Sequence, residues 1–399
     1  MKRIAILFAA IPMAYACMAQ TSYTARDYRE MAAATIDSIY KYYSVEGTTL
    51  LSENYPFDAD YVAGYLSQDA PVDHSGRRPF AFLWPYSGTL SMTAAMMDAT
   101  KGKKYRRLLE DKVLPGLEQY FDDRRTPASY ASYIVKSDPN AGRFYDDNDW
   151  IGLDFVDLYE LTRAKKFLHK AEIVWKFIED GTDDKLGGGV YWSDEKRSKN
   201  TCSTAPSAVM AMKLYMATGE EKYLVSGQSL YKWAKSVLQD KNDHLYYDNI
   251  SVRGHVDHRK FAYNSGQMLQ AAVLLYKATK QEEYLNDARE VAESCYNYFF
   301  REFHPEGGEP FRVLRSGSTW FNCIMFRGFI ELYGVDKAEK KYIDAFEKSL
   351  SYIWDHGRSA EGLFSQDFTG RRQDRHKWLL TQTAMVEMFA RMSVLKADK

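Results

Sequence analysis

Two consecutive aspartates, Asp146 and Asp147, stand where the chain predicts the start of a helix. They belong to the stretch RFYDDNDWIGLDFVDLYELTR, residues 143–163, in which three acids and an amide occupy four positions. Neighbouring carboxylates repel each other, and one Asp is enough to cap a helix. At a helix start the first of the two residues can be extended, so that both carboxylates face one cavity. Close carboxyl groups then split their pKa values, so that one stays protonated while the other is ionised.

This pair is suited to cleaving a glycosidic bond. Consecutive Cα atoms lie about 3.8 Å apart, so the two carboxyl groups can approach the ~5–5.5 Å separation that retaining glycosidases use. Helix capping alone is the structural alternative. Flanking aromatic residues, Tyr145 and Trp150, and a position beside a long loop favour a catalytic site.

The elements around the pair follow a repeat. In five segments an apolar helix ends in a Leu-Tyr-like pair, a short turn follows, and a new helix opens with an aromatic residue, at intervals of roughly sixty residues. These aromatic residues are Tyr105, Phe167, Tyr223, Tyr284 and Tyr342. Further helices are predicted at 23–43 and 378–395. If these two pair with each other, six helical hairpins close into an all-α (α/α)6 toroid; an open solenoid would need polar outer faces on its end helices. We expect a single domain over residues 20–399.

The long connections all lie at one end of the predicted hairpins, opposite the short turns, and include residues 44–85, 181–200 and 240–263. They are rich in Tyr, Trp, Asp, Asn and Gly, which suits a carbohydrate groove because aromatic faces stack on sugar rings and Asp and Asn bind hydroxyls. Core packing is the alternative for these aromatic residues and for Trp320. The predicted groove residues are Trp84, Tyr145, Trp150, Tyr191, Trp192, Asn200, Asp248, Tyr263 and Asn264.

Composition limits the partners. The chain has 53 basic and 54 acidic residues and no long basic run, so we expect no nucleic-acid partner. Residues 1–19 read as a secretory signal peptide, whose apolar run is too short to span a bilayer; cleavage before Cys17 would instead leave a lipid anchor. We expect a monomer exported to the periplasm or cell surface of a Gram-negative bacterium. The remaining cysteines, at 202, 295 and 323, lie in apolar helical stretches and predict buried free thiols.

Other motifs point to no metal or cofactor. His255 and His258 in HVDH are too close in sequence for a helical i, i+4 ligand pair and lack partners. The triplet at 187–189, GGG, lacks the strand and Lys of a phosphate loop, and we expect it to let the backbone turn close to a ligand. The DDND stretch is similar to the magnesium motif of isoprenoid synthases, but there the third acid stands one residue later.

The stretches FYDDNDWIGLDFVDLYELT, GGGVYWS and KNTCSTAPSAVMAMKLYMATG resemble glycoside hydrolase family 76, the α-1,6-mannanases, as do the later LYYDNI, AYNSGQ and MFRGF. The resemblance covers nearly the whole chain after the signal peptide. It implies an (α/α)6 fold and metal-independent, retaining cleavage of α-1,6-mannan. It also implies that Asp146 is the nucleophile, Asp147 the acid/base and Asp248 a substrate contact. Ser265 and Arg327 depart from the residues commoner in the family, Gln and Lys.

The sequence is compatible with three functions. The first is an endo-α-1,6-mannanase. The second is a transglycosidase on mannose-containing glycans, like the family's fungal cell-wall members, and the third is a glycan-binding protein on a degenerate toroid. The intact pair of aspartates favours an enzyme, because binding alone does not need both. A signal peptide without a C-terminal anchor signal favours hydrolysis.

Overall fold

In the part of the chain that the structure describes, six inner and six outer helices form a closed double ring. The computed structural model describes residues 22–62 and 78–397, so the predicted signal peptide and Cys17 lie outside the described residues. The inner helices are α2 (Leu83–Thr100), α5 (Tyr145–Thr162), α7 (Thr201–Thr218), α9 (Ala262–Thr279), α11 (Thr319–Val335) and α13 (Leu379–Ala397). The outer ones are α1 (Ala25–Tyr42), the segmented α3–η2–α4 (Lys103–Leu108, Leu109–Val113, Leu114–Leu117), α6 (Lys165–Asp180), α8 (Glu221–Leu238), α10 (Glu282–Phe299) and α12 (Lys340–His356).

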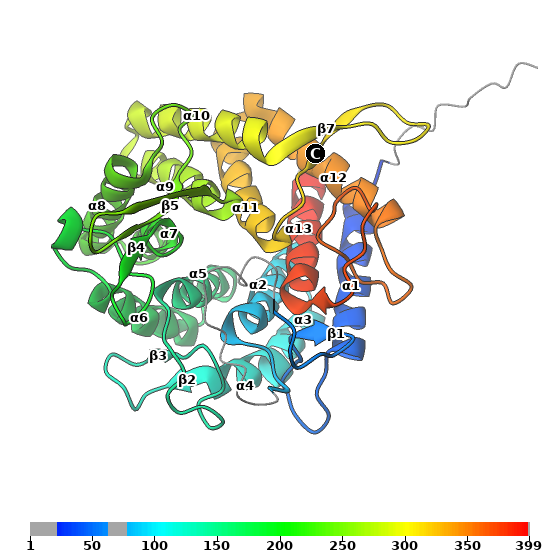
Figure 1. Cartoon of the computed structure of the whole chain (residues 1–399), viewed down its shortest axis with the longest axis horizontal. Helices are drawn as coiled ribbons and strands as arrows, with labels where there is room; N and C mark the ends of the chain where they lie inside the picture. Colours follow the sequence, from blue (N-terminus) through cyan, green and yellow to red (C-terminus); the bar gives the residue numbers. More distant parts are fainter. Residues whose placement is uncertain (1–21, 63–77, 398–399) are drawn as a thin grey trace, which may run out of the picture.

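The ring is closed by its last inner helix. Each inner helix packs on the next, and α13 packs on α2 as well as on α11. Helix α1 lies against α13, so the blue and red ends of the chain meet in Figure 1. The predicted (α/α)6 toroid of six hairpins is therefore confirmed, and the open solenoid is excluded.

The two rings differ in sequence pattern. Inner helices are buried on nearly every side; in α7 each residue from Thr201 to Met212 is buried. Outer helices bury one face only, as in α6, where Phe167, Ala171, Val174 and Ile178 recur at the helical period. The predicted repeat matches this division, because each of its five aromatic residues is the buried third residue of an outer helix.

The long loops all lead into the N-terminal ends of the inner helices. They carry the short strands of the described residues: β1 (Asn54–Tyr55) with β9 (Lys377–Trp378), β2 (Phe121–Asp122) with β3 (Ser129–Tyr130), β4 (Ser198–Asn200) with β5 (Tyr247–Ser251) and β6 (Val256–Lys260), and β7 (Phe300–Phe303) with β8 (Phe311–Leu314). Short 3₁₀ segments lie at η3 (Glu118–Tyr120), η4 (Lys185–Gly187) and η5 (Lys337–Glu339). No helix in the described ranges is both long enough and apolar enough to cross a membrane.

Charged side chains lie inside the ring and join its helices. Arg327 of α11 donates to Glu387 of α13 from Nε (2.6 Å) and Nη2 (2.9 Å), and Arg391 donates to the same carboxylate. Burial alone would raise the pKa of Glu387, but the two guanidinium groups lower it to about 2. Arg327 also lies 3.7 Å from Asp154 of α5. The family departure at Arg327 therefore belongs to the packing of the ring.

Helices α9 and α11 are in close contact at Gly266. A Cβ on Gly266 would lie 2.4 Å from the Met325 Cα, whereas a Cβ on Gly334, in the same pair of helices, would meet nothing within 4 Å. We predict that Gly266→Ala lowers the free energy of unfolding by about 1–3 kcal/mol through overpacking. Gly334→Ala should raise it by roughly 0.5–1 kcal/mol, because Ala loses less backbone entropy on folding.

Thermal unfolding followed by circular dichroism checks this pair. Equal melting temperatures for the two variants would contradict the close contact between α9 and α11.

Candidate active site

Asp146 and Asp147 lie in the first turn of α5, and helix capping does not account for both. The N-cap residue is Phe144, which is extended and makes no side-chain capping bond. The Asp147 backbone N–H donates to Asp146 Oδ1 at 3.0 Å, so one carboxylate oxygen serves the helix end. Among the described residues no hydrogen bond reaches the Asp147 carboxyl group. That carboxyl group remains available for chemistry.

The next two polar residues anchor this turn. Asn148 accepts from the Tyr130 N–H at 2.8 Å and donates to the Tyr130 carbonyl at 2.9 Å, which ties α5 to β3. Asp149 accepts from Ser207 Oγ of α7 at 2.9 Å and 3.0 Å. Both side chains are buried. The DDND stretch thus divides into a pair facing the site and a pair holding the helix in place.

Burial and hydrogen bonding separate the two carboxyl groups electrostatically. Burial raises the pKa of Asp147 well above its usual value, and the negative charge of Asp146 raises it further. Burial also raises the pKa of Asp146, but the Cys202 thiol, the Asp147 N–H and the Trp192 indole oppose this rise by hydrogen bonding to the carboxylate. Asp146 therefore ionises first, and Asp147 keeps its proton.

Trp192 contacts the pair directly. Its indole Nε1 donates to Asp146 Oδ2 at 3.2 Å, and its ring packs on Phe144 with centroids 4.9 Å apart. The sequence predicted Trp192 as a groove residue; the structure brings it to the Asp146 carboxylate. Cys202, at the start of α7, is a neighbour that the sequence analysis treated only as a buried thiol. Its position in the first turn of α7, two residues after Asn200, was the available signal.

Aromatic side chains from several inner-helix starts form one cluster beside the pair. Trp150 packs edge-on against Trp320 at 4.6 Å, and Trp320 packs against Trp84 at 5.3 Å. Tyr263 stacks on Phe321 at 3.9 Å. Trp378 meets Trp84 edge-on at 5.5 Å. The predicted groove residues Trp84, Trp150 and Tyr263 thus belong to one cluster with Trp320. Phe321 and Trp378, which the sequence did not single out, also belong to it.

Asp248 of β5 lies beside the start of α9. Its carboxylate accepts from Asn249 Nδ2 at 3.0 Å and Asn264 Nδ2 at 3.4 Å, and Arg259 lies 3.5 Å away. Burial raises the pKa of Asp248. The Asn264 Oδ1 atom is buried and has no hydrogen-bond partner among the described residues, which leaves an acceptor for a ligand hydroxyl. Asn200 is buried and accepts from Ser198 Oγ at 2.7 Å.

Two predicted groove residues are turned elsewhere, so the prediction was wrong for them. Tyr145 stacks on Phe177 of α6 at 4.5 Å and donates to Asp180. Tyr191 is 2% exposed and donates to Asp183 at 2.9 Å. Aromatic residues next to a site residue along the chain can point to the outer ring, because neighbouring side chains diverge.

The glycine triplet is also explained by packing. Gly189 has φ +79°, and a Cβ there would lie 2.5 Å from the Trp233 ring. Gly188 and Gly189 therefore let the backbone pass a tryptophan of α8, and the approach of the triplet to a ligand stays a prediction. Ser265, the other family departure, accepts from the Tyr246 N–H at 3.1 Å and is buried.

Potential metal ligands are scattered in the described ranges, 22–62 and 78–397. No group of three or more His, Cys, Asp and Glu side chains there is arranged to hold an ion. His258 of β6 packs against Tyr247 at 4.5 Å. Cys202, Cys295 and Cys323 are free and buried.

Comparison with known proteins places this arrangement in a family. The family 76 glycoside hydrolase (mannosidase) of Bacteroides thetaiotaomicron VPI-5482 is 36% identical, with a TM-score of 0.82 over 93% of this chain and 99% of that chain. An inactive α-1,6-mannanase variant of Salegentibacter sp. HEL1_6, in complex with α-1,6-mannotriose, has a TM-score of 0.74 at 22% identity, over 92% of this chain and 100% of that chain, and shows the fold alone.

A mannan endo-1,6-alpha-mannosidase of Candida albicans is 26% identical over 147 residues, 34% of this chain and 32% of the relative. The chain spans less than half the length of the curated fungal relatives that it matches. The family model for glycosyl hydrolase family 76 matches residues 27–399. The chain belongs to glycosyl hydrolase family 76.

Proposed function

We propose that this protein is an endo-acting α-1,6-mannanase that cleaves the α-1,6-linked backbone of mannan with retention of configuration. The observation that carries the proposal is the first turn of α5, where two adjacent carboxyl groups differ in their contacts. Asp146 accepts from the Asp147 N–H and the Trp192 indole, which hold its pKa at about 7 against burial. The unbonded Asp147 has its pKa raised well above the usual value. The substrate class is supported by the names of the similar proteins, a mannosidase and an α-1,6-mannanase. The aromatic cluster and the unpaired Asn264 oxygen suit a sugar ligand.

In the proposed mechanism Asp146 is the nucleophile and Asp147 the acid/base. The Asp146 carboxylate attacks the anomeric carbon while the bond to the leaving oxygen breaks, and that oxygen takes the proton of Asp147. Water then attacks the same carbon, Asp147 accepts a proton from the water, and Asp146 is released as a carboxylate. Two inversions give retention. An inverting route needs ~6.5–9.5 Å between the carboxyl groups, which suits consecutive residues poorly.

A transglycosidase is the second candidate. It would use the same pair and the same covalent intermediate, with a sugar hydroxyl in place of water. The fungal relative, itself named as an endo-mannosidase, gives no reason to prefer transfer. A glycan-binding protein would not need a protonated Asp147 beside an ionised Asp146. We further propose a single catalytic domain over 20–399, a signal peptide over 1–19 with export to the periplasm or cell surface, and a monomer.

The first prediction concerns products. Purified protein incubated with debranched α-1,6-mannan should release oligosaccharides of several lengths early in the reaction, because an endo enzyme cuts within the chain. Proton NMR should detect the α-anomer first. Initial release of mannose alone would contradict endo action, and initial appearance of the β-anomer would contradict retention.

The second prediction separates the two roles. Asp147→Ala should lose most activity on mannan but retain the first step on an aryl mannoside whose leaving group needs no proton. Azide should then restore turnover by forming a glycosyl azide, detectable by mass spectrometry. Asp146→Ala should be inactive on both substrates, because no nucleophile remains. Azide rescue of Asp146→Ala and not of Asp147→Ala, with a mannosyl azide of the α-configuration, would reverse the assignment, because an acid/base variant retains the configuration and a nucleophile variant inverts it.

The third prediction concerns Asp248. Asp248→Asn should raise KM for mannooligosaccharides by about tenfold, because a hydrogen bond between a charged acceptor and a sugar hydroxyl is weakened. The melting temperature should change little. Asp257→Asn is a matched control, because Asp257 lies on the same hairpin and also contacts Arg259. Equal KM values for the two variants would contradict substrate binding by Asp248.

A further inference from the structure

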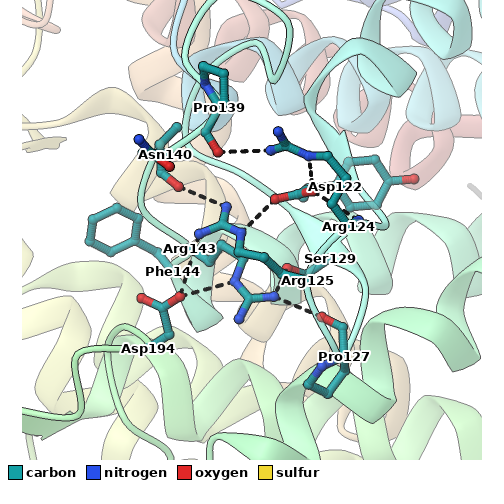
Figure 2. A network of polar contacts seen from close by, with 12 residues as sticks. Asp122, Arg124, Arg125, Pro127, Ser129, Pro139, Asn140, Arg143, Phe144 and Asp194 are labelled. Atoms are coloured by element: carbon teal, nitrogen blue, oxygen red, sulfur yellow. Dashed lines mark hydrogen bonds and ion pairs between the residues drawn. The ribbon is translucent and has the colours of Figure 1, made fainter.

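Three arginines and two aspartates join the loop before α5 to the loop after α6. Asp122 of β2 accepts from Arg124 Nε at 2.8 Å and Arg125 Nε at 2.6 Å. Arg143 Nε donates to Asp194 at 3.0 Å, and Arg125 approaches the same carboxylate at 3.9 Å. Figure 2 shows these side chains as one continuous network. It connects the segment that leads into α5 with the segment that carries Trp192.

The backbones of these two segments pair beside the network. Phe144 and Ser193 form an antiparallel bridge. The Tyr145 N–H donates to the Trp192 carbonyl at 2.9 Å, and the Asp194 N–H donates to the Arg143 carbonyl at 3.1 Å. The Arg143–Asp194 ion pair therefore closes one end of a short ladder, and the Trp192–Asp146 hydrogen bond closes the other.

Arg143 is well placed to hold this ladder rigidly. Its guanidinium group is buried, packs 5.0 Å from the centre of the Phe177 ring, and donates from Nη1 to the Pro127 carbonyl at 2.8 Å. Of these partners of the Arg143 guanidinium group, only Asp194 belongs to the loop that carries Trp192. Phe177 belongs to α6, and Pro127 belongs to the loop before α5. Loss of the Asp194 carboxylate would thus remove the side-chain contact that ties the loop of Trp192 to Arg143.

We propose that Arg143 and Asp194 are positioning residues, which hold the Trp192 indole against Asp146 and so keep this carboxylate ionised for attack. This inference rests on the proposed function, in which Asp146 is the nucleophile. Neither residue touches the substrate in this role. Their effect passes through two main-chain hydrogen bonds and one indole N–H, and a donor to a carboxylate lowers its pKa.

Other groups also act on Asp146 and would persist in an Asp194 variant. Asp147 and Asp149 of α5 lie close enough for the charge of Asp146 to raise the pKa of both, and the Cys202 thiol of α7 lowers the pKa of Asp146 by hydrogen bonding. Tyr263 of α9 faces it beside Cys202, and its neighbour Asp248 of β5 acts on that thiol. None of these contacts involves Arg143 or Asp194, so a change in either residue reports on the Trp192 contact.

The test follows the indole N–H resonance of Trp192 by ¹⁵N NMR across a pH titration of the full chain. Trp192→Phe assigns the resonance, and Asp146→Asn should abolish its titration. In Asp194→Asn the midpoint should rise by about one pH unit, because Asp146 loses stabilisation of its ionised form. Arg143→Lys, which cannot donate to both Asp194 and the Pro127 carbonyl, should raise it in the same direction. Asp194→Glu should restore most of the wild-type midpoint.

The matched control is Asp336→Asn. Arg289 donates to Asp336 from Nε at 3.0 Å, in an arginine–aspartate pair whose arginine is more exposed, at the opposite, short-turn end of the ring. This variant should leave the Trp192 midpoint unchanged. The proposal would be overturned if Asp194→Asn and Arg143→Lys had the same Trp192 midpoint as the wild type. It would also be overturned if Asp336→Asn shifted the midpoint as much as Asp194→Asn does.

Activity gives a second readout. The acidic limb of the kcat/KM profile on α-1,6-mannan should move to higher pH in Asp194→Asn and in Trp192→Phe, with no further shift in the double variant. Additive shifts would show that Asp194 acts by another route and would overturn the proposal. A wild-type protein without mannanase activity would contradict the proposed function instead, and the NMR midpoints would still decide on the two positioning residues.

Discussion

Closure of the inner ring is the constraint on which the rest of the structure depends. Because α13 packs between α11 and α2, the inner helices close on themselves, and aromatic side chains at the starts of α2, α5, α9 and α11 meet at one face. A closed ring buries helices on every side, so the polar groups that remain inside must pair. The Arg327–Glu387 contact does this across α11 and α13, and Asp154 extends it to α5. A buried pair of this kind adds little net stability, but losing one partner leaves an uncompensated charge.

The same closure creates the electrostatic conditions of the site. The inner-helix starts converge, with aromatic residues from four of them in mutual contact, and the two aspartates in the first turn of α5 are half-buried. Desolvation then raises the pKa of both Asp146 and Asp147, and only specific donors can restore the ionised form of one of them. Trp192 lies in the loop before α7, and Cys202 lies in the first turn of α7. The distinction between the two neighbouring aspartates is thus made by tertiary contacts.

The loops are held by charge, because they have little sheet to stabilise them. Lys199 is completely buried, and its ammonium group donates to the carbonyls of Asp183, Lys185 and Gly188 and to the Asp183 carboxylate. It lies within the loop that carries Trp192, on the side opposite to Asp194. The Arg143–Asp194 pair fixes the other side. A loop fastened at both ends holds one indole in one place, which is what a preorganised site requires.

The sequence by itself determined the repeat, the helix count, the face that carries the long loops and the paired aspartates. Each of these is a local pattern: a helical period, a turn, or two adjacent residues. It also led to Trp192, because that residue follows a turn on the loop-rich face. It could not separate Trp84 and Trp150, which join the aromatic cluster, from Tyr145 and Tyr191, which turn toward acids beside the outer ring. It could not assign Cys202 or Arg143 either. Only the tertiary structure decided these, because the direction of a side chain and the pKa of a carboxyl group depend on neighbours that are distant in sequence.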